Sequence, residues 1–178
     1  MEKDTKVEVR SLRIIKPSSP TSHNNRNLKL SLIDQVMSSY GSMVLFYPST
    51  SSNTNTDDSS SFEVYAKSKR LEESLSKTLV HFYPLAGRLY HNISIDCNDK
   101  GSVFLGGQIN CKLLDFLEQP DLNLIHRFIP KPNKQATASN PILLVQLTGF
   151  SCGGIALGVS ISHKIADGKS FSSFIQSW

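Results

Sequence analysis

The strongest constraint on the fold is a pair of strand-like segments toward the end of the 178-residue sequence. Residues 142–150 and 155–161 are apolar or alternating, and the run Ser-Cys-Gly-Gly between them has the composition of a turn, so the pattern predicts a β-hairpin. The second segment places larger side chains on one side, expected to pack in a core, and small ones on the other. The small residues are Ala156, Gly158 and Ser160. We expect them to permit close approach and to leave room for a substrate beside the histidine that follows.

Elsewhere the sequence predicts strands interleaved with amphipathic helices. Apolar residues recur at helical spacing within 63–82 and again after Gly168, so both segments are predicted as helices. Short strands are expected at 7–15, 44–47, 88–96 and 102–105. Because the sequence has no internal repeat, this order predicts an α/β (α+β) fold in which a mixed β-sheet is flanked by helices.

One polar segment interrupts this pattern. Residues 49–61 contain only Ser, Thr, Asn and Asp. Such a stretch buries too little apolar surface to offset the entropy of ordering it, so we predict a flexible polar loop over 49–61.

Composition excludes several classes of function. The formal charge of +4 is spread thinly, without the basic and aromatic clusters of nucleic-acid surfaces, so we expect no nucleic-acid partner. Three irregularly spaced cysteines fit neither a disulfide framework nor a CxxC metal site. No run approaches the roughly 18 apolar residues of a membrane span, and the charged start lacks a secretory signal. The sequence therefore predicts a cytoplasmic protein with no membrane partner, in which the sequon at 92–94 is incidental.

His163 and Asp167 stand between the second hairpin strand and the final helix. A histidine at the end of a strand can lie at the edge of a pocket and act as a general base near neutral pH. The alternative is a core or turn histidine whose nitrogens are satisfied by backbone hydrogen bonds. Asp167 precedes the helical stripe and is well placed as an N-cap, a role that competes with pairing to His163.

Two other kinds of site fit the sequence poorly. The remaining histidines have no metal-ligand spacing to His163, so we expect no metal. A serine hydrolase would require a Gly-x-Ser-x-Gly turn, whereas Ser160 lies inside a predicted strand and no second glycine follows it. A hydrolase that uses the same histidine is the least favoured interpretation.

Several motifs occur in an order that resembles one enzyme family. The runs are Ser-His-Lys-Ile-Ala-Asp-Gly at 162–168, Leu-Ser-Leu-Ile-Asp at 30–34, Phe-Tyr-Pro-Leu-Ala-Gly-Arg at 82–88 and Gln-Leu-Thr-Gly-Phe at 146–150. The first looks like the His-x-x-x-Asp-Gly signature of the BAHD family of plant acyl-CoA-dependent acyltransferases, and the resemblance covers nearly the whole chain. It implies that 1–178 is the N-terminal domain of a two-domain enzyme, with a fold similar to chloramphenicol acetyltransferase.

The resemblance also implies a chemistry. It assigns His163 as the general base that takes a proton from a hydroxyl or amine of a plant specialised metabolite while that atom attacks acyl-CoA, which is a cosubstrate rather than a permanently bound cofactor. Asp167 and Gly168 would be structural parts of the motif. The full-length enzyme would be a monomer, and its second signature, Asp-Phe-Gly-Trp-Gly, does not occur here. We therefore expect the fragment alone to be inactive, and the competing interpretation is a non-enzymatic, truncated remnant or a partner-binding fragment.

Overall fold

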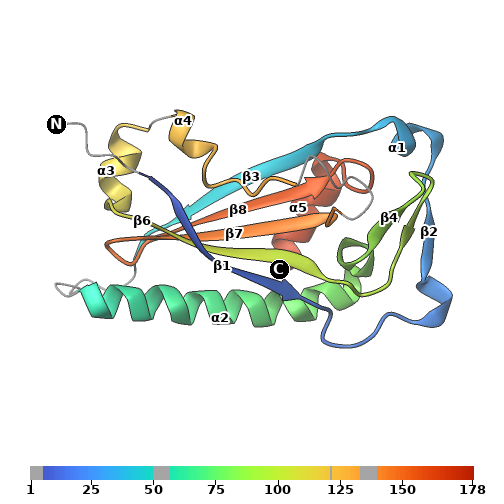
Figure 1. The fold of residues 1–178 in the computed structure, drawn as a ribbon, viewed down its shortest axis with the longest axis horizontal. Helices are drawn as coiled ribbons and strands as arrows, with labels where there is room; N and C mark the ends of the chain where they lie inside the picture. Colours follow the sequence, from blue (N-terminus) through green and yellow to red (C-terminus); the bar gives the residue numbers. More distant parts are fainter. Residues whose placement is uncertain (1–5, 50–56, 121, 133–139) are drawn as a thin grey trace.

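The computed structural model describes residues 6–49, 57–120, 122–132 and 140–178, and its centre is a five-stranded mixed sheet (Figure 1). The strands, in their order across the sheet, are β1 (Glu8–Ile15), β6 (Ser102–Ile109), β7 (Leu143–Phe150), β8 (Ile155–Ser162) and β3 (Tyr40–Tyr47). Strands β6 and β7 are parallel and the other neighbours are antiparallel. The mixed sheet and the β7–β8 hairpin predicted from the sequence are thereby confirmed.

A small second sheet lies at one end of the molecule. Its strands are β2 (Asn27–Lys29), β5 (Ser94–Asp96) and β4 (Arg88–Tyr90), and all pairs are antiparallel. Short helical turns adjoin it, namely η1 (His23–Asn25), α1 (Leu32–Val36) and η2 (Tyr83–Ala86).

Helices cover both faces of the large sheet. The long α2 (Asp57–His81) and the final α5 (Gly168–Ser177) bury Leu75, Leu79 and Phe174 in one apolar cluster with the odd-numbered residues of β8. On the opposite face α3 (Leu113–Glu118) and α4 (Leu122–Ile125) close a second cluster, in which Phe116 and Phe128 pack edge to face. The sheet is therefore the middle layer of the fold, and both its faces are buried.

The small-residue side of β8 does not leave room for a substrate, contrary to the expectation from the sequence. A Cβ built on Gly158 would collide with the carbonyl oxygen of Phe128, and the hydroxyl of Ser160 donates a hydrogen bond to the carbonyl of Pro130 at 2.9 Å. The backbone of the segment after α4 fills this space. The small side chains permit close approach of the protein's own chain.

The last part of the segment 49–61, predicted as a flexible polar loop, belongs to a helix. Helix α2 begins at Asp57, so the last part of that segment is helical, and residues 50–56 lie outside the described residues. Acidic and serine residues, which reduced the apolar content of the segment, are also favourable in the first turn of a helix. Composition alone could not separate these two roles.

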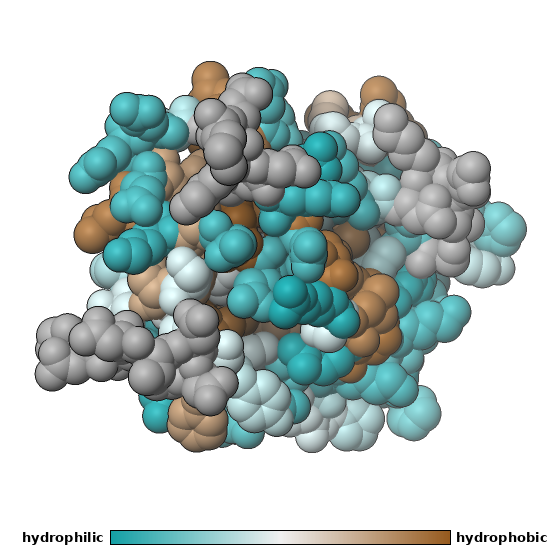
Figure 2. Space-filling model, turned by 60° about the vertical axis from the view of Figure 1, so that its left-hand side comes forward, coloured by the Kyte–Doolittle hydropathy of each residue, from teal (hydrophilic) through white to brown (hydrophobic). Residues whose placement is uncertain are grey.

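Large apolar side chains reach the surface at scattered places, interspersed with hydrophilic ones (Figure 2). The most exposed include Leu32, Ile33 and Val36 of α1 and Leu114 and Leu122 of α3 and α4. In the part of the chain that the structure describes, no helix is both long and apolar enough to span a membrane.

Candidate active site

The segment between β8 and α5 is a tight loop held by backbone hydrogen bonds. The amides of Ile165 and Ala166 donate to the carbonyl of Ser162 at 3.1 and 3.3 Å. The amide of His163 donates to the carbonyl of Ser39 at 2.9 Å, which ties the loop to the start of the edge strand β3. The loop is therefore fixed to the sheet at the position where it presents the histidine.

The His163 ring has one nitrogen engaged and one available. Its Nδ1 lies 3.0 Å from the carbonyl oxygen of Ala166, which can only accept a hydrogen bond. In the neutral ring Nδ1 therefore carries the proton and Nε2 keeps its lone pair, and Nε2 has no hydrogen-bond partner among the described residues. The ring is half-buried. A core histidine with both nitrogens satisfied by the backbone, the alternative considered from the sequence, does not describe this geometry.

Asp167 caps α5 rather than pairing with His163. Its carboxylate accepts a hydrogen bond from the amide of Ser170 at 2.8 Å, as expected for an N-cap. Hydrogen bonds from the backbone and side chain of Ser170 lower the pKa of this exposed carboxyl below its ordinary value. Gly168 is the first residue of the helix, and a Cβ built on it would meet nothing within 4 Å. The capping role predicted from the sequence is confirmed.

This cap carries a pH-dependent prediction for Asp167→Ala and Asp167→Asn. Because the folded-state pKa is lowered, the carboxylate stabilises the fold above its unfolded-state pKa and the effect is lost as pH falls through the folded-state pKa. We expect Asp167→Ala to melt at a lower temperature than the wild type at pH 7. The advantage of the wild type over Asp167→Asn, which keeps an acceptor without a charge, should vanish in acid. Thermal unfolding followed by circular dichroism at several pH values checks both, and an Ala variant with an unchanged melting temperature at pH 7 contradicts the cap.

A second motif from the sequence lies beside this loop and supports it. Ser31 and Asp34 form a capping box, in which the Ser31 hydroxyl accepts from the Asp34 amide at 3.2 Å and the Asp34 carboxylate accepts from the Ser31 amide at 3.0 Å. The resulting helix α1 presents the carbonyl of Gln35, which accepts from Lys164 Nζ at 2.9 Å and from Asn92 Nδ2 at 3.1 Å. Burial lowers the pKa of Lys164. The histidine loop is thereby joined to α1 and to the small sheet, a role for Lys164 that the sequence pattern did not reveal.

Other nucleophiles in the described part of the chain are poorly suited to catalysis. The Ser160 hydroxyl is buried and lies 2.9 Å from that of Ser42, besides its bond to Pro130. Burial, reinforced by the neighbouring Asp96 and Asp99, raises the pKa of the Cys97 thiol to about 11, so it stays protonated near neutral pH. No group of three or more His, Cys, Asp or Glu side chains that could hold a metal ion occurs within the described ranges. The imidazole of His163 remains the best candidate for acid–base chemistry.

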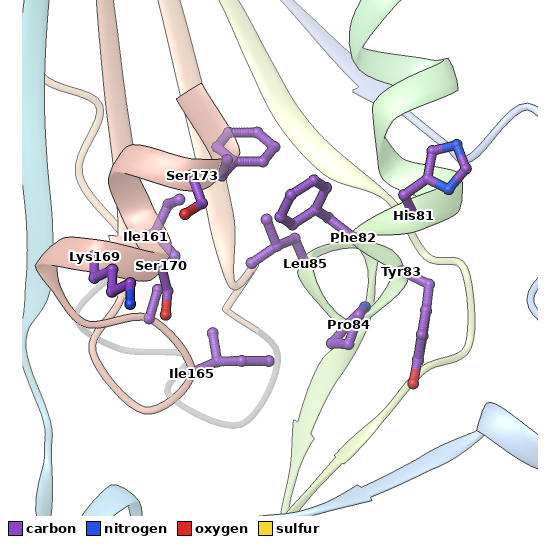
Figure 3. A pocket seen from close by; sticks show the side chains of 12 residues that line it. His81, Phe82, Tyr83, Pro84, Leu85, Ile161, Ile165, Lys169, Ser170 and Ser173 are labelled. Atoms are coloured by element: carbon purple, nitrogen blue, oxygen red, sulfur yellow. The ribbon is translucent and has the colours of Figure 1, made fainter. Parts of the chain in front are cut away.

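Two cavities flank the histidine loop. One of about 410 Å³ lies between η2 and α5, where Phe82, Pro84 and Leu85 lie across from Ile165 and Ser170 (Figure 3). The other, of about 620 Å³, lies on the side of the small sheet, and Tyr40 and Lys164 are among the residues that line it. His163 lines neither of them. Its neighbours in the loop do line them, Ile165 and Ala166 the smaller cavity and Ser162 and Lys164 the larger one.

The fold and the site define an α/β domain that presents a half-buried histidine, His163, between a hairpin strand and a capped helix. The protein-family profile described as the Transferase family matches residues 5–178. The chain belongs to this family, the BAHD acyltransferases whose motifs it resembles.

Named relatives agree with this assignment. Salutaridinol 7-O-acetyltransferase of Papaver somniferum is 42% identical over 177 residues, which are 97% of this chain and 36% of that protein. Acyltransferase Pun1 of Capsicum frutescens is 39% identical, and the match covers 97% of this chain and 40% of that protein. Stemmadenine O-acetyltransferase of Catharanthus roseus is 36% identical, and the match covers 97% of this chain and 41% of that protein. The chain spans about two fifths of the length of the curated relatives it matches.

Solved structures share the fold. The crystal structure of vinorine synthase superimposes with a TM-score of 0.75 at 33% identity, over 96% of this chain and 41% of that one. F. sporotrichioides TRI101, solved in complex with coenzyme A and T-2, superimposes with a TM-score of 0.59 over 85% of this chain and 38% of that one. At 19% identity it shows the fold alone. The predicted resemblance to CoA-dependent acyltransferases is confirmed at the level of family and fold.

Proposed function

We propose that this chain supplies the general base of an acyltransferase that moves an acyl group from acyl-CoA to a hydroxyl or amine of a plant specialised metabolite. The observation that carries the proposal is the hydrogen bond from His163 Nδ1 to the Ala166 carbonyl, because it leaves the lone pair of Nε2 available to accept a proton. In the competing proposal the chain is a truncated remnant without activity.

The chemistry requires a single ring. Nε2 removes the proton from the acceptor hydroxyl or amine as that atom forms a bond to the thioester carbonyl carbon. When the tetrahedral intermediate collapses, the carbon–sulfur bond breaks and the imidazolium returns the proton to the departing thiolate. The Ala166 carbonyl accepts a hydrogen bond from Nδ1 throughout, and this stabilises the transient positive charge on the ring. No covalent acyl-enzyme is needed.

The names of the relatives support part of this scheme. Salutaridinol 7-O-acetyltransferase and stemmadenine O-acetyltransferase are named for transfer of an acetyl group to oxygen, so a hydroxyl acceptor and an acetyl donor are the first choices to test. The family supports acyl-CoA as the cosubstrate. A cytoplasmic location and a monomeric state stay predictions.

The direct test compares two forms of the protein. Each is incubated with acetyl-CoA or other acyl-CoA thioesters and a panel of plant alcohols and amines, with mass detection of acylated products and a thiol assay for released coenzyme A. We expect turnover from a full-length protein that includes the second signature and none from residues 1–178 alone. Absence of product from the full-length protein on a broad panel, with its fold intact, contradicts the proposal and favours the remnant. Thioester cleavage without an acceptor favours a hydrolase.

A further inference from the structure

The edge strand β3 passes directly beside the His163 ring. Gly41 of β3 pairs with Ile161 of β8, so the two strands are in register immediately before the histidine loop. Ser39 and Tyr40 fasten the start of β3, because the Ser39 carbonyl accepts from the His163 amide and the Tyr40 hydroxyl donates to the Pro141 carbonyl at 2.8 Å. The backbone at Gly41 is thereby held against the ring.

The missing side chain of Gly41 is what this contact requires. A Cβ built on Gly41 would lie 3.1 Å from both Cε1 and Nε2 of His163, tighter than ordinary van der Waals contact. A point on the lone-pair axis of Nε2 is farther from Cε1 than from Nε2, so the equal distances place this Cβ beside the Cε1–Nε2 bond. Gly41 therefore packs against the side of the ring without blocking the lone pair of Nε2. The next nearest atom to the built Cβ is Cδ1 of Phe171, at an ordinary contact distance of 3.6 Å.

Backbone conformation does not explain a glycine here. The glycines with positive φ are Gly101 and Gly153, so the backbone of Gly41 is one that other residues adopt. Glycine inside a strand makes the folded protein less stable than alanine would at the same position. The contact with the imidazole is the feature that favours glycine at this position.

We propose that Gly41 is a positioning residue for His163, a proposal that rests on the general-base function proposed above. The bare Cα lets the ring lie close to β3, where Nδ1 reaches the Ala166 carbonyl and Nε2 keeps its lone pair. A methyl group at this position moves the ring by a few tenths of an ångström and weakens the Nδ1 hydrogen bond. Gly41 thus acts through the tautomer and orientation of His163, without contact with substrate.

The first test measures the tautomer of His163 by nitrogen NMR of protein whose histidines carry nitrogen-15. The signals of His163 are identified as those that disappear in the variant His163→Gln. At a pH where the ring is neutral we expect Nδ1–H to dominate in the wild type. In Gly41→Ala the ratio of Nδ1–H to Nε2–H should fall roughly fivefold, the factor that corresponds to losing one ordinary hydrogen bond. The matched control is Gly168→Ala, which adds a methyl group in open space a few residues away and should leave the ratio unchanged.

The outcomes separate the two proposals. A wild type in which His163 is mainly Nε2–H overturns the general-base geometry itself. A wild type that is mainly Nδ1–H, with an unchanged ratio in Gly41→Ala, overturns only the role of Gly41. For the full-length enzyme the corresponding readout is a lower kcat at unchanged KM in Gly41→Ala.

A double-mutant cycle covers the case in which Gly41→Ala folds poorly. In the wild-type background we expect this substitution to raise the unfolding equilibrium constant at least about fivefold, because the added methyl group overpacks the site. In His163→Ala the tight contact is gone, so the same substitution should leave the constant unchanged or lower it. An equal cost in both backgrounds would show that the glycine serves the strand and would overturn the proposal.

Discussion

Replacing His163 by alanine in the full-length protein is expected to abolish acyl transfer while the fold persists. A positioned general base contributes roughly 10² to 10⁴ in rate, so kcat should fall by at least about two orders of magnitude. Steady-state kinetics with an acyl-CoA and its acceptor measure the loss, and thermal unfolding shows whether the variant is folded.

His163→Asn is the matched control for this result. The amide nitrogen of asparagine is attached to Cγ, as Nδ1 is in histidine, so it can still donate to the Ala166 carbonyl, but asparagine cannot take up a proton near neutral pH. We expect Asn and Ala variants to be equally inactive, with Asn the more stable of the two. Retained turnover in either variant would contradict the assignment of His163 as the base.

The largest stability effect is expected for Gly158→Ala. The added Cβ would collide with the Phe128 carbonyl oxygen and would lie 3.2 Å from Cδ of Pro130, so the segment after α4 must move away from the sheet. Overpacking of this kind costs about 3 kcal/mol, and the separation also strains the hydrogen bond from Ser160 to Pro130. Urea unfolding followed by circular dichroism measures the loss.

Gly168→Ala provides the comparison for Gly158→Ala within the same chain. It is the same chemical change at a site where the new methyl group meets nothing within 4 Å, and alanine is the better helix former. We expect no loss of stability there. If both variants unfold at the same urea concentration as the wild type, the segment after α4 does not pack on β8 as described.

The elements with long, regular patterns were predictable from the sequence, and those that depend on distant partners were not. The β7–β8 hairpin and the helices α2 and α5 follow from period-2 and period-3.6 spacing, which is local information. What fills the small-residue side of β8 was not predictable, because Phe128 comes from a segment with no regular pattern. The small size of Gly158 and Ser160 indicated that something approaches closely, but not whether it is a ligand or the chain itself.

The candidate site shows the same division. His163 and Asp167 could be selected because a strand pattern precedes them and a helix pattern follows, and the N-cap is a local interaction. The hydrogen bond to the Ala166 carbonyl determines that Nδ1 of His163 carries the proton. The close packing of the ring depends on Gly41, which lies in a strand far away in the sequence. The first contact is local but has no sequence pattern that marks it, and the second joins residues far apart in the sequence. The role of His163 as the base stays a prediction until the kinetics are measured.

The neighbourhood of β3 and β8 has a consequence for how the protein acquires its structure. Ser42 of β3 and Ser160 of β8 face each other although they are 118 positions apart in the sequence. These two distant segments must therefore pair before the His163 ring can pack against Gly41. Closing so long a loop has a large entropic cost and slows folding, whereas the β7–β8 hairpin can form early. Until β3 arrives, β8 is an unpaired apolar edge that can recruit strands from other molecules. Assembly of the candidate site and protection from aggregation are therefore completed by the same late pairing step.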